Sequence, residues 1–217
     1  MFFSDSNAET DDLLWTLPLK ISSDHLEQLT SYRSTFKDSL KFVIDKIREL
    51  GLSIASGRIK TNVSIITKLI REKSIRLSQI QDIVGCRIVV DTIATQNSVV
   101  DLLKNNFDVS VIDDRRAMPN HGYRSVHLIV SVDGKLVEIQ IRTIYQDSWA
   151  QFSEKLSDLI GLNIKYGSGD KKICELLEKL SLWIKKLEEE KEEKLLQTIL
   201  SEIHQTYIEI CSYIKIR

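Results

Sequence analysis

The stretch GKLVEIQIRT, residues 134–143, has the period-two pattern of a strand with one apolar face. Its apolar positions are Val137, Ile139 and Ile141, and its polar positions are Glu138, Gln140 and Arg142. A solvated strand face more often carries Thr, Ser, Lys and Glu, whereas this one carries an acid, an amide and a guanidinium in a row. The pattern therefore predicts a strand with a core face and a face of unusual chemistry.

Asp133 and Gly134 precede this strand and form a strong two-residue hairpin signal. With these residues as the loop, His127 lies opposite Gln140, and directly opposed residues share a face of the sheet. One face is then expected to hold Tyr123, Ser125, His127, Glu138, Gln140 and Arg142. An ordinary wet face is the commoner alternative, but the absence of Lys and Thr decoration favours a ligand-lined surface.

The rest of the chain predicts an α/β (α+β) fold, with a mixed central sheet of four to five strands flanked by helices. Further strands are expected at 53–60, 82–90, 107–113 and 123–132, and helices at 24–50, 63–73, 95–105, 143–160 and from 170 to the end. The expected organisation is an acidic leader over 1–22, an α/β domain over 23–165 and a helical extension over 166–217.

Composition restricts the partners. The chain has 217 residues, with 30 basic and 31 acidic side chains, so a polyanion site must be local rather than a global field. Three distant cysteines form no metal or redox motif, which suits a reducing compartment. The sequence shows no signal peptide or apolar run that could span a membrane, so a cytoplasmic protein without membrane contact is expected.

Four ordered motifs resemble the synthetase domain of the RelA/SpoT family. They are GRIKTNVSIITK at 57–68, DIVGCRIVV at 82–90, HGYRSVH at 121–127 and VEIQIRT at 137–143, and the resemblance runs from about Leu26 to Gly161. It implies a nucleotidyltransferase-like fold over the 23–165 domain and transfer of the β,γ-pyrophosphate of ATP to a hydroxyl of an acceptor. Such a reaction depends on charge neutralisation and in-line positioning.

The resemblance also assigns residues. It makes Asp82 and Glu138 the catalytic pair and the ligands of Mg²⁺, a cation that prefers oxygen ligands; Glu138 would also accept the proton of the attacking hydroxyl. It implies that ATP is bound by Arg58, Lys60, Ser64, Lys68 and Arg87, with the two arginines on either side of the adenine. It implies that the acceptor is bound by Tyr123, which stacks on the base, and by His127, Gln140 and Arg142. Taken alone, Asp82 would be interpreted as a strand-entry cap and His127 as a structural histidine.

Two departures bear on the acceptor. Alarmone-making members have a Pro-Lys-x-Asn-Gly-Tyr pattern where this chain has MPNHGY, and a Glu-His pair where it has Ser153-Glu154. The forms HGYRSVH and QDSWAQFSEKLSD look more like the toxic small alarmone synthetases, which implies the tRNA 3′-CCA end as acceptor and inhibition of translation. RNA binding is then expected at Arg115, Arg116 and Arg124.

Two other functions stay open. The first is synthesis of guanosine or adenosine alarmones from the corresponding nucleotides, and the second is an inactive module that senses nucleotide or RNA. The helical ends carry apolar stripes on charged helices, which suit packing on the core, a homo-oligomer or an antitoxin protein.

Overall fold

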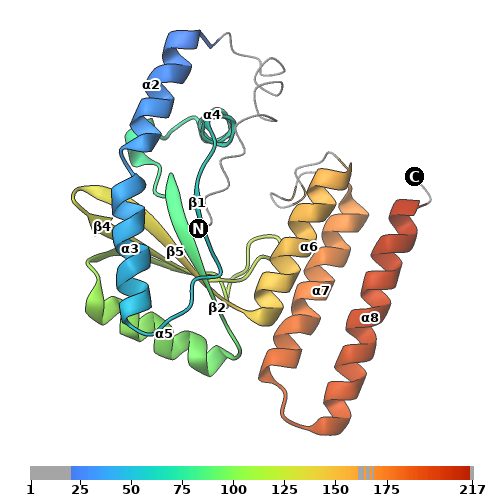
Figure 1. The fold of residues 1–217 in the computed structure, drawn as a ribbon. Helices are drawn as coiled ribbons and strands as arrows, with labels where there is room; N and C mark the ends of the chain where they lie inside the picture. The colour runs from blue at the N-terminus through green and yellow to red at the C-terminus, as the bar shows by residue number, and fades with distance from the viewer. Residues whose placement is uncertain (1–20, 161–163, 165–166, 168, 216–217) are drawn as a thin grey trace. The chain divides into compact units, whose positions relative to one another are not determined.

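The computed structural model describes residues 21–160, 164, 167 and 169–215 of the chain. The expected leader over 1–22 therefore lies almost entirely outside the described residues. The helices and strands follow in the order α2 (Ser23–Ser34), α3 (Lys37–Glu49), β1 (Ser56–Ile59), α4 (Asn62–Arg71), η1 (Leu77–Gln79), β2 (Val84–Val90), α5 (Ile93–Asn106), β3 (Val109–Asp114), β4 (Val126–Val132), β5 (Lys135–Thr143), α6 (Ile144–Ile160), α7 (Lys171–Glu189) and α8 (Glu193–Lys215) (Figure 1).

Within the described residues, β1 to β5 form one mixed sheet with the strand order β1-β2-β5-β4-β3. This confirms the predicted fold class, a mixed α/β sheet flanked by helices. The hairpin of β4 and β5 also has its predicted two-residue loop. Asp133 and Gly134 have φ values of 49° and 74°, and two positive φ angles in succession match the turn whose twist suits a hairpin.

Strands β1 and β2 pair in antiparallel fashion, with Arg58 opposite Gly85 and Ser56 opposite Arg87. The run at 82–90 was expected to be a buried strand, but β2 is fully buried only at alternate residues, from Val84 to Val90. The other face carries Gly85 and Arg87 and is only partly covered.

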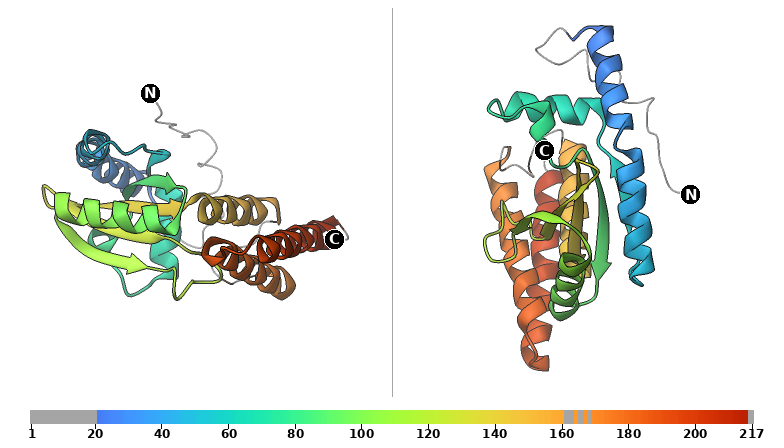
Figure 2. Two further views of the ribbon diagram at one scale, coloured as in Figure 1. Left: turned by 90° about the horizontal axis from the view of Figure 1, so that it is seen from below. Right: turned by 90° about the vertical axis from the view of Figure 1, so that its left-hand side faces the viewer.

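The helix predicted over 24–50 is two helices, α2 and α3, because the chain leaves the helical path at Thr35 and Phe36. The predicted core stripe of α3 is confirmed: Leu40, Val43, Ile44 and Ile47 are all buried. Helix α2 lies beside α4 (Figure 2), where Arg33 and Thr30 exchange hydrogen bonds with Asn62. The helical end also divides in two, because the chain is extended at Glu190 between α7 and α8.

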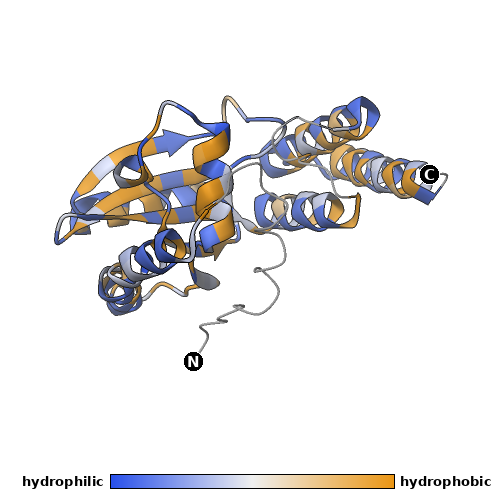
Figure 3. Cartoon of the chain, turned by 90° about the horizontal axis from the view of Figure 1, so that it is seen from above, coloured by the Kyte–Doolittle hydropathy of each residue, from blue (hydrophilic) through white to orange (hydrophobic). Residues whose placement is uncertain are grey.

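The chain forms two compact units. Of the described residues, the first consists of those up to Ile88 with Asp101–Ile112 and His127–Gln140, and the second of Val89–Val100, Asp113–Val126 and those from Ile141 onward. In the second unit α7 packs against both α6 and α8. A single apolar core joins the three helices, with Trp149 and Leu156 from α6, Leu177 and Leu180 from α7 and Ile210 from α8. Hydrophobic and hydrophilic residues accordingly share each of these helices in Figure 3.

None of the described helices combines the length and the apolar character that a membrane crossing requires.

Candidate active site

Asp82 lies just before β2, and two lysines bind its carboxylate. Lys60, directly after β1, donates to Oδ2 at 2.5 Å, and Lys68, on α4, donates to Oδ1 at 2.9 Å. All three side chains are at most 21% exposed. Burial alone would raise the pKa of Asp82, but the two ammonium groups outweigh it and lower the pKa to about 2. Asp82 is therefore ionised at neutral pH.

Glu138, on β5, is the second acid of the predicted catalytic pair, and it also belongs to the first unit. Its Oε1 is 2.7 Å from Nδ1 of His127, and Gln140 donates to its Oε2 at 2.6 Å. Burial raises the pKa of Glu138, but the bonds from His127 and Gln140 lower it further than burial raises it, so the net shift is downward. The predicted gathering of His127, Glu138 and Gln140 on one face is thus confirmed.

The two acids are close enough to interact. The negative charge of Asp82 is among the causes that raise the pKa of Glu138, against the larger effects that lower it. Gly85 leaves the room between their strands, because a Cβ atom there would lie 2.8 Å from the carbonyl oxygen of Glu138. A side chain at position 85 would therefore push β2 away from β5.

The remaining residues predicted to bind ATP also belong to the first unit. Arg58 and Arg87 lie on one face of the β1–β2 pair, because Arg87 is opposite Ser56, and Ser56 is two residues before Arg58 on β1. Ser64 is exposed in the first turn of α4, where its backbone N–H donates to the hydroxyl of the capping residue Thr61 at 3.2 Å. The two arginines thus share a face of the sheet and Ser64 lies on α4, and their binding of ATP stays a prediction.

The donor set can be tested for a divalent cation. Among the described residues, no group of three or more His, Cys, Asp and Glu side chains could hold a metal ion. Two ionised carboxylates suit Mg²⁺, which protein sites bind through one or two carboxylates together with substrate phosphates. Asp82 and Glu138 therefore fit a site that a polyphosphate completes.

Tyr123 and Arg142 form a second cluster, in the second unit. Arg142 Nη2 donates to the Tyr123 hydroxyl at 2.9 Å, and Arg142 Nη1 donates to Asp147 Oδ1 at 2.9 Å. Gln151 donates to the other oxygen of Asp147 at 2.6 Å. Arg142 is only 3% exposed. The resemblance predicts that Arg142 contacts the acceptor, whereas the structure shows it buried behind the ring of Tyr123.

The loop that carries Tyr123 is held by the helices of the second unit. Gly122 has φ +84°, and its carbonyl oxygen accepts a hydrogen bond of 2.6 Å from Ser181 on α7. A Cβ atom at Gly122 would lie 2.8 Å from the ring of Trp149, whose Nε1 donates to the carbonyl of Leu177. Only glycine suits both this backbone conformation and this space.

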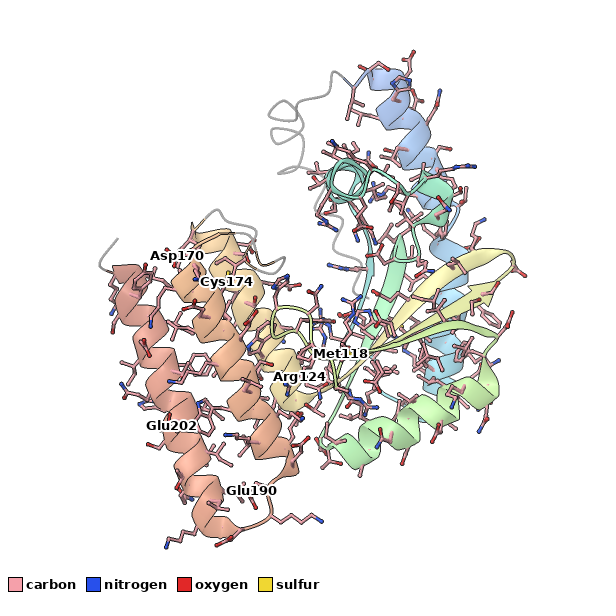
Figure 4. All side chains as sticks on the ribbon, turned by 180° about the vertical axis from the view of Figure 1, so that it is seen from behind. Met118, Arg124, Asp170, Cys174, Glu190 and Glu202 are labelled. Carbon is pink, nitrogen blue, oxygen red and sulfur yellow. The ribbon has the colours of Figure 1, made fainter. Side chains whose placement is uncertain are left out.

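The three arginines predicted to bind RNA do not form an exposed basic track. Arg115 pairs with Asp113 at 2.6 Å, and Arg116 pairs with Asp114 at 2.5 Å. Arg124 is 4% exposed and lines a cavity of about 440 Å³ in the second unit, whereas Met118 in the same loop is 85% exposed (Figure 4). Neighbouring acids thus neutralise Arg115 and Arg116, and Arg124 is buried.

Sequence reasoning missed a buried polar network in the second unit. Gln96 donates to the carbonyl of Ile141 and to the side chain of Gln146, and Thr143 donates to Glu188. Burial raises the pKa of Glu188, partly offset by the bonds from Thr143 and Gln146. Gln146 and Asp147 lie within the quoted segment QDSW, and two polar residues at the start of an apolar helix were the available signal.

Sequence comparison places this geometry among known proteins. The model of the "Region found in RelA / SpoT proteins" matches residues 57–157. The GTP pyrophosphokinase YjbM of Bacillus subtilis is 34% identical over 188 residues, which cover 76% of this chain and 85% of YjbM. An uncharacterized protein of Mycobacterium tuberculosis is 38% identical over 116 residues, so that this chain matches only 42% of that relative's length.

Structural comparison agrees. The small alarmone synthetase 1 of Bacillus subtilis, bound to its product pppGpp, superposes with a TM-score of 0.63 and 28% identity. That superposition covers 75% of this chain and 94% of the synthetase. The chain belongs to the RelA/SpoT synthetase family, the family of the GTP pyrophosphokinases and small alarmone synthetases.

Proposed function

We propose that this protein is an ATP-dependent pyrophosphokinase that transfers the β,γ-pyrophosphate of ATP to the 3′-hydroxyl of GDP or GTP. The observation that carries the proposal is the face of the first unit on which Asp82, Lys60 and Lys68 meet and Glu138 is held by His127. Those are the groups that a polyphosphate and its cation require. The relative named a GTP pyrophosphokinase supports a guanosine acceptor.

The reaction forms one bond and breaks one. The acceptor hydroxyl oxygen bonds to the β-phosphorus of ATP, the bond from that phosphorus to the α,β-bridging oxygen breaks, AMP leaves, and the hydroxyl proton passes to solvent water. The ammonium groups of Lys60 and Lys68 would neutralise phosphate oxygens. A bound Mg²⁺ would add charge neutralisation, with Asp82 and Glu138 as its protein ligands. The lowered pKa of Glu138 suits a metal ligand better than a general base.

The second unit would supply the acceptor contact. Tyr123 is partly exposed, and its hydroxyl is fixed by Arg142. A ring held at one end presents a face on which a purine can stack at low entropic cost. The proposal therefore assigns base stacking to Tyr123 and support of its ring to Arg142.

The tRNA 3′ end is the other acceptor that the sequence suggested, and the geometry favours it less. Arg115 and Arg116 are paired with neighbouring acids, and Arg124 is buried. The formal net charge of the chain is −1. A long polyanion needs several exposed cations along its backbone, whereas a nucleotide needs only a local cluster. Toxicity, an antitoxin partner and oligomers through the helical ends stay predictions.

Incubation with γ-labelled ATP and magnesium tests the proposal, with GDP, GTP, AMP or deacylated tRNA as acceptor. We expect label in guanosine tetra- or pentaphosphate with release of AMP. Label in tRNA would replace the guanosine acceptor, label in AMP would point to an adenosine alarmone, and transfer to none of the four acceptors would contradict the proposal.

A paired substitution links the result to the site. Glu138→Gln is expected to reduce transfer by about two orders of magnitude or more, since it removes a charge from the transfer site. Glu27→Gln, an exposed acid on α2, is expected to leave transfer unchanged. Circular dichroism and melting temperature would show that both variants fold.

A further inference from the structure

Both oxygens of the Asp82 carboxylate accept a hydrogen bond from an ammonium group in the arrangement that the structure shows. Lys60 occupies Oδ2 at 2.5 Å and Lys68 occupies Oδ1 at 2.9 Å. Their ammonium groups are permanent cations at neutral pH, and both are mostly buried beside the carboxylate. A divalent cation that approached Asp82 would meet two like charges at a few ångströms in a partly desolvated site.

Glu138 is held differently. Its partners are the imidazole of His127 and the amide of Gln140, and neither is a permanent cation. Asp82 is thus paired with two ammonium groups, whereas Glu138 is paired with an imidazole and an amide. The asymmetry concerns Asp82 alone.

We propose that Lys60 and Lys68 close Asp82 to divalent cations until a polyphosphate draws the two ammonium groups away. Phosphate oxygens of ATP offer the lysines a stronger set of acceptors than one carboxylate. Once the lysines have moved to the phosphates, both oxygens of Asp82 become ligands for the cation. Lys60 and Lys68 therefore exchange partners, and cation and nucleotide bind as a coupled pair.

The coupling has a reciprocal consequence. If polyphosphate raises the affinity of Asp82 for the cation, the cation raises the affinity of the site for polyphosphate by the same factor. Removing the lysines should break the coupling by strengthening cation binding, whereas an ordinary damaging substitution would weaken it. Without them, Asp82 should bind a divalent cation better when no nucleotide is present, although nucleotide binding itself becomes weaker.

Mn²⁺ is a suitable probe, because electron paramagnetic resonance counts free and bound ion directly. The full chain without nucleotide is expected to show no site tighter than about 1 mM, which is typical of a weak carboxylate site. The double variant Lys60→Met/Lys68→Met is expected to bind one Mn²⁺ about tenfold or more tightly, for a gain of about 1.4 kcal/mol. Adding Asp82→Asn to the double variant should abolish the gain.

Lys41→Met is the matched control, because Lys41 also binds an acid, Asp45, at 2.6 Å but is exposed on α3. It should leave Mn²⁺ binding unchanged. If the double variant does not fold, Lys68→Met alone keeps the Lys60 bond and should give a smaller gain. Tight Mn²⁺ binding by the unsubstituted chain without nucleotide would overturn the proposal, as would folded variants that gain no affinity.

This inference rests on the proposed function, and its failure can be told apart from the failure of that function. The Mn²⁺ titration uses no transfer, so a gain in the double variant would stand even if no pyrophosphate were transferred. Conversely, normal transfer to GDP together with tight Mn²⁺ binding by the free chain would overturn the lysine exchange and leave the pyrophosphokinase intact.

Discussion

Single residues show how two acids of one unit are held ionised by different means. Asp82 is paired with two lysines, and Glu138 is paired with a histidine and an amide. In both cases burial opposes the charge and the hydrogen-bonded partners overcome it. A change at any partner therefore alters the pKa of an acid as well as its position.

The pairing of Asp82 predicts a pH-dependent contribution to stability. Folding lowers its pKa from 3.8 to about 2, so the unfolded chain binds this proton more readily than the folded chain. The contribution, about 2 kcal/mol, is fully present above pH 4 and is lost as the pH falls through about 2. We expect Asp82→Asn to lower the free energy of unfolding by about 2 kcal/mol near pH 6.

Urea denaturation of both chains near pH 6 and near pH 2.5 would measure this. The difference between them should shrink at the lower pH, because the unfolded chain then binds a proton at Asp82 while the folded chain has only begun to do so. A difference that is independent of pH would show that the ion pairs of Asp82 add nothing to stability. Exposed Asp45, substituted in the same way, provides the comparison.

Asp147 gives a second prediction, because it accepts a hydrogen bond from Arg142, which also donates to the Tyr123 hydroxyl. Its two oxygens accept from Arg142 and from Gln151, and an amide in its place can accept on one side only. We expect Asp147→Asn to raise KM for the guanosine acceptor about tenfold, the effect of losing one charged hydrogen bond, with KM for ATP unchanged. Steady-state kinetics with each substrate varied separately would show the split.

The control for this substitution is Asp158→Asn, which changes an exposed acid of the same helix. It should affect neither constant. If Asp147→Asn raised both KM values equally, Asp147 would be a general support of the fold rather than a positioning residue for Tyr123.

What the sequence could predict at this scale depended on how local the interaction is. Alternation along 134–143 placed Glu138 and Gln140 on one face, and the structure confirms it. The partner of Arg142 comes from a helix five residues later, beyond the reach of strand periodicity. The acids that neutralise Arg115 and Arg116 precede each by two residues, so that signal was present and was outweighed by the resemblance to RNA-modifying proteins.

Secondary structure elements reveal a similar limit. The Asp133-Gly134 turn is specified by its own backbone preferences, and it appears where the sequence predicts it. The break between α2 and α3 falls at Thr35 and Phe36, which include neither Gly nor Pro, and Phe36 is 5% exposed. The apolar periodicity of the sequence therefore predicted a single helix over 24–50, where the structure has α2 and α3.

Two glycines with positive φ provide a test of this distinction. Gly134 has φ +74° and open space around it, whereas Gly122 has φ +84° and the ring of Trp149 against it. Gly134→Ala should lower the free energy of unfolding only by backbone strain, about 1 kcal/mol. Gly122→Ala adds steric overlap with a buried ring and should cost about 3 kcal/mol or more.

Chemical denaturation of the two variants side by side would measure both costs. Gly122→Ala should also weaken acceptor binding, because Tyr123 follows directly in the chain. Equal costs at the two positions would mean that the loop can move away from Trp149, and that the contact with Ser181 does not fix it.

For the whole molecule, each of the two units holds some of the residues that the proposed function requires. The first holds both acids and the lysines, and the second holds Tyr123, Arg142 and the helices α6, α7 and α8. The sequence predicted the apolar stripes of the helical end but could not say what they cover. Those stripes form a shared core with Trp149, and through Ser181 the helices support the loop of Tyr123.

Ending the chain at Glu190 would remove α8 and test this division. Ile199 and Ile210 would be lost from the core, and α7 would lose its cover, at a cost of about 4 kcal/mol or more. The loss should spread through α7 to Gly122 and Tyr123. We therefore expect a lower melting temperature and weaker binding of GDP, while calorimetry with a non-hydrolysable ATP analogue shows nucleotide affinity within about threefold of the full chain.

A chain that ends after Ile214 is the control, because it removes only the last described residue and the two that follow. It should behave as the full chain does in all three measurements. The chain that ends at Glu190 could instead lose affinity for the ATP analogue as completely as for GDP, while circular dichroism shows the strands intact. The helical end would then support the phosphate site too. Stability of the acceptor loop would then not be separable from that of Asp82 and its lysines, because a single cooperative unit would hold both.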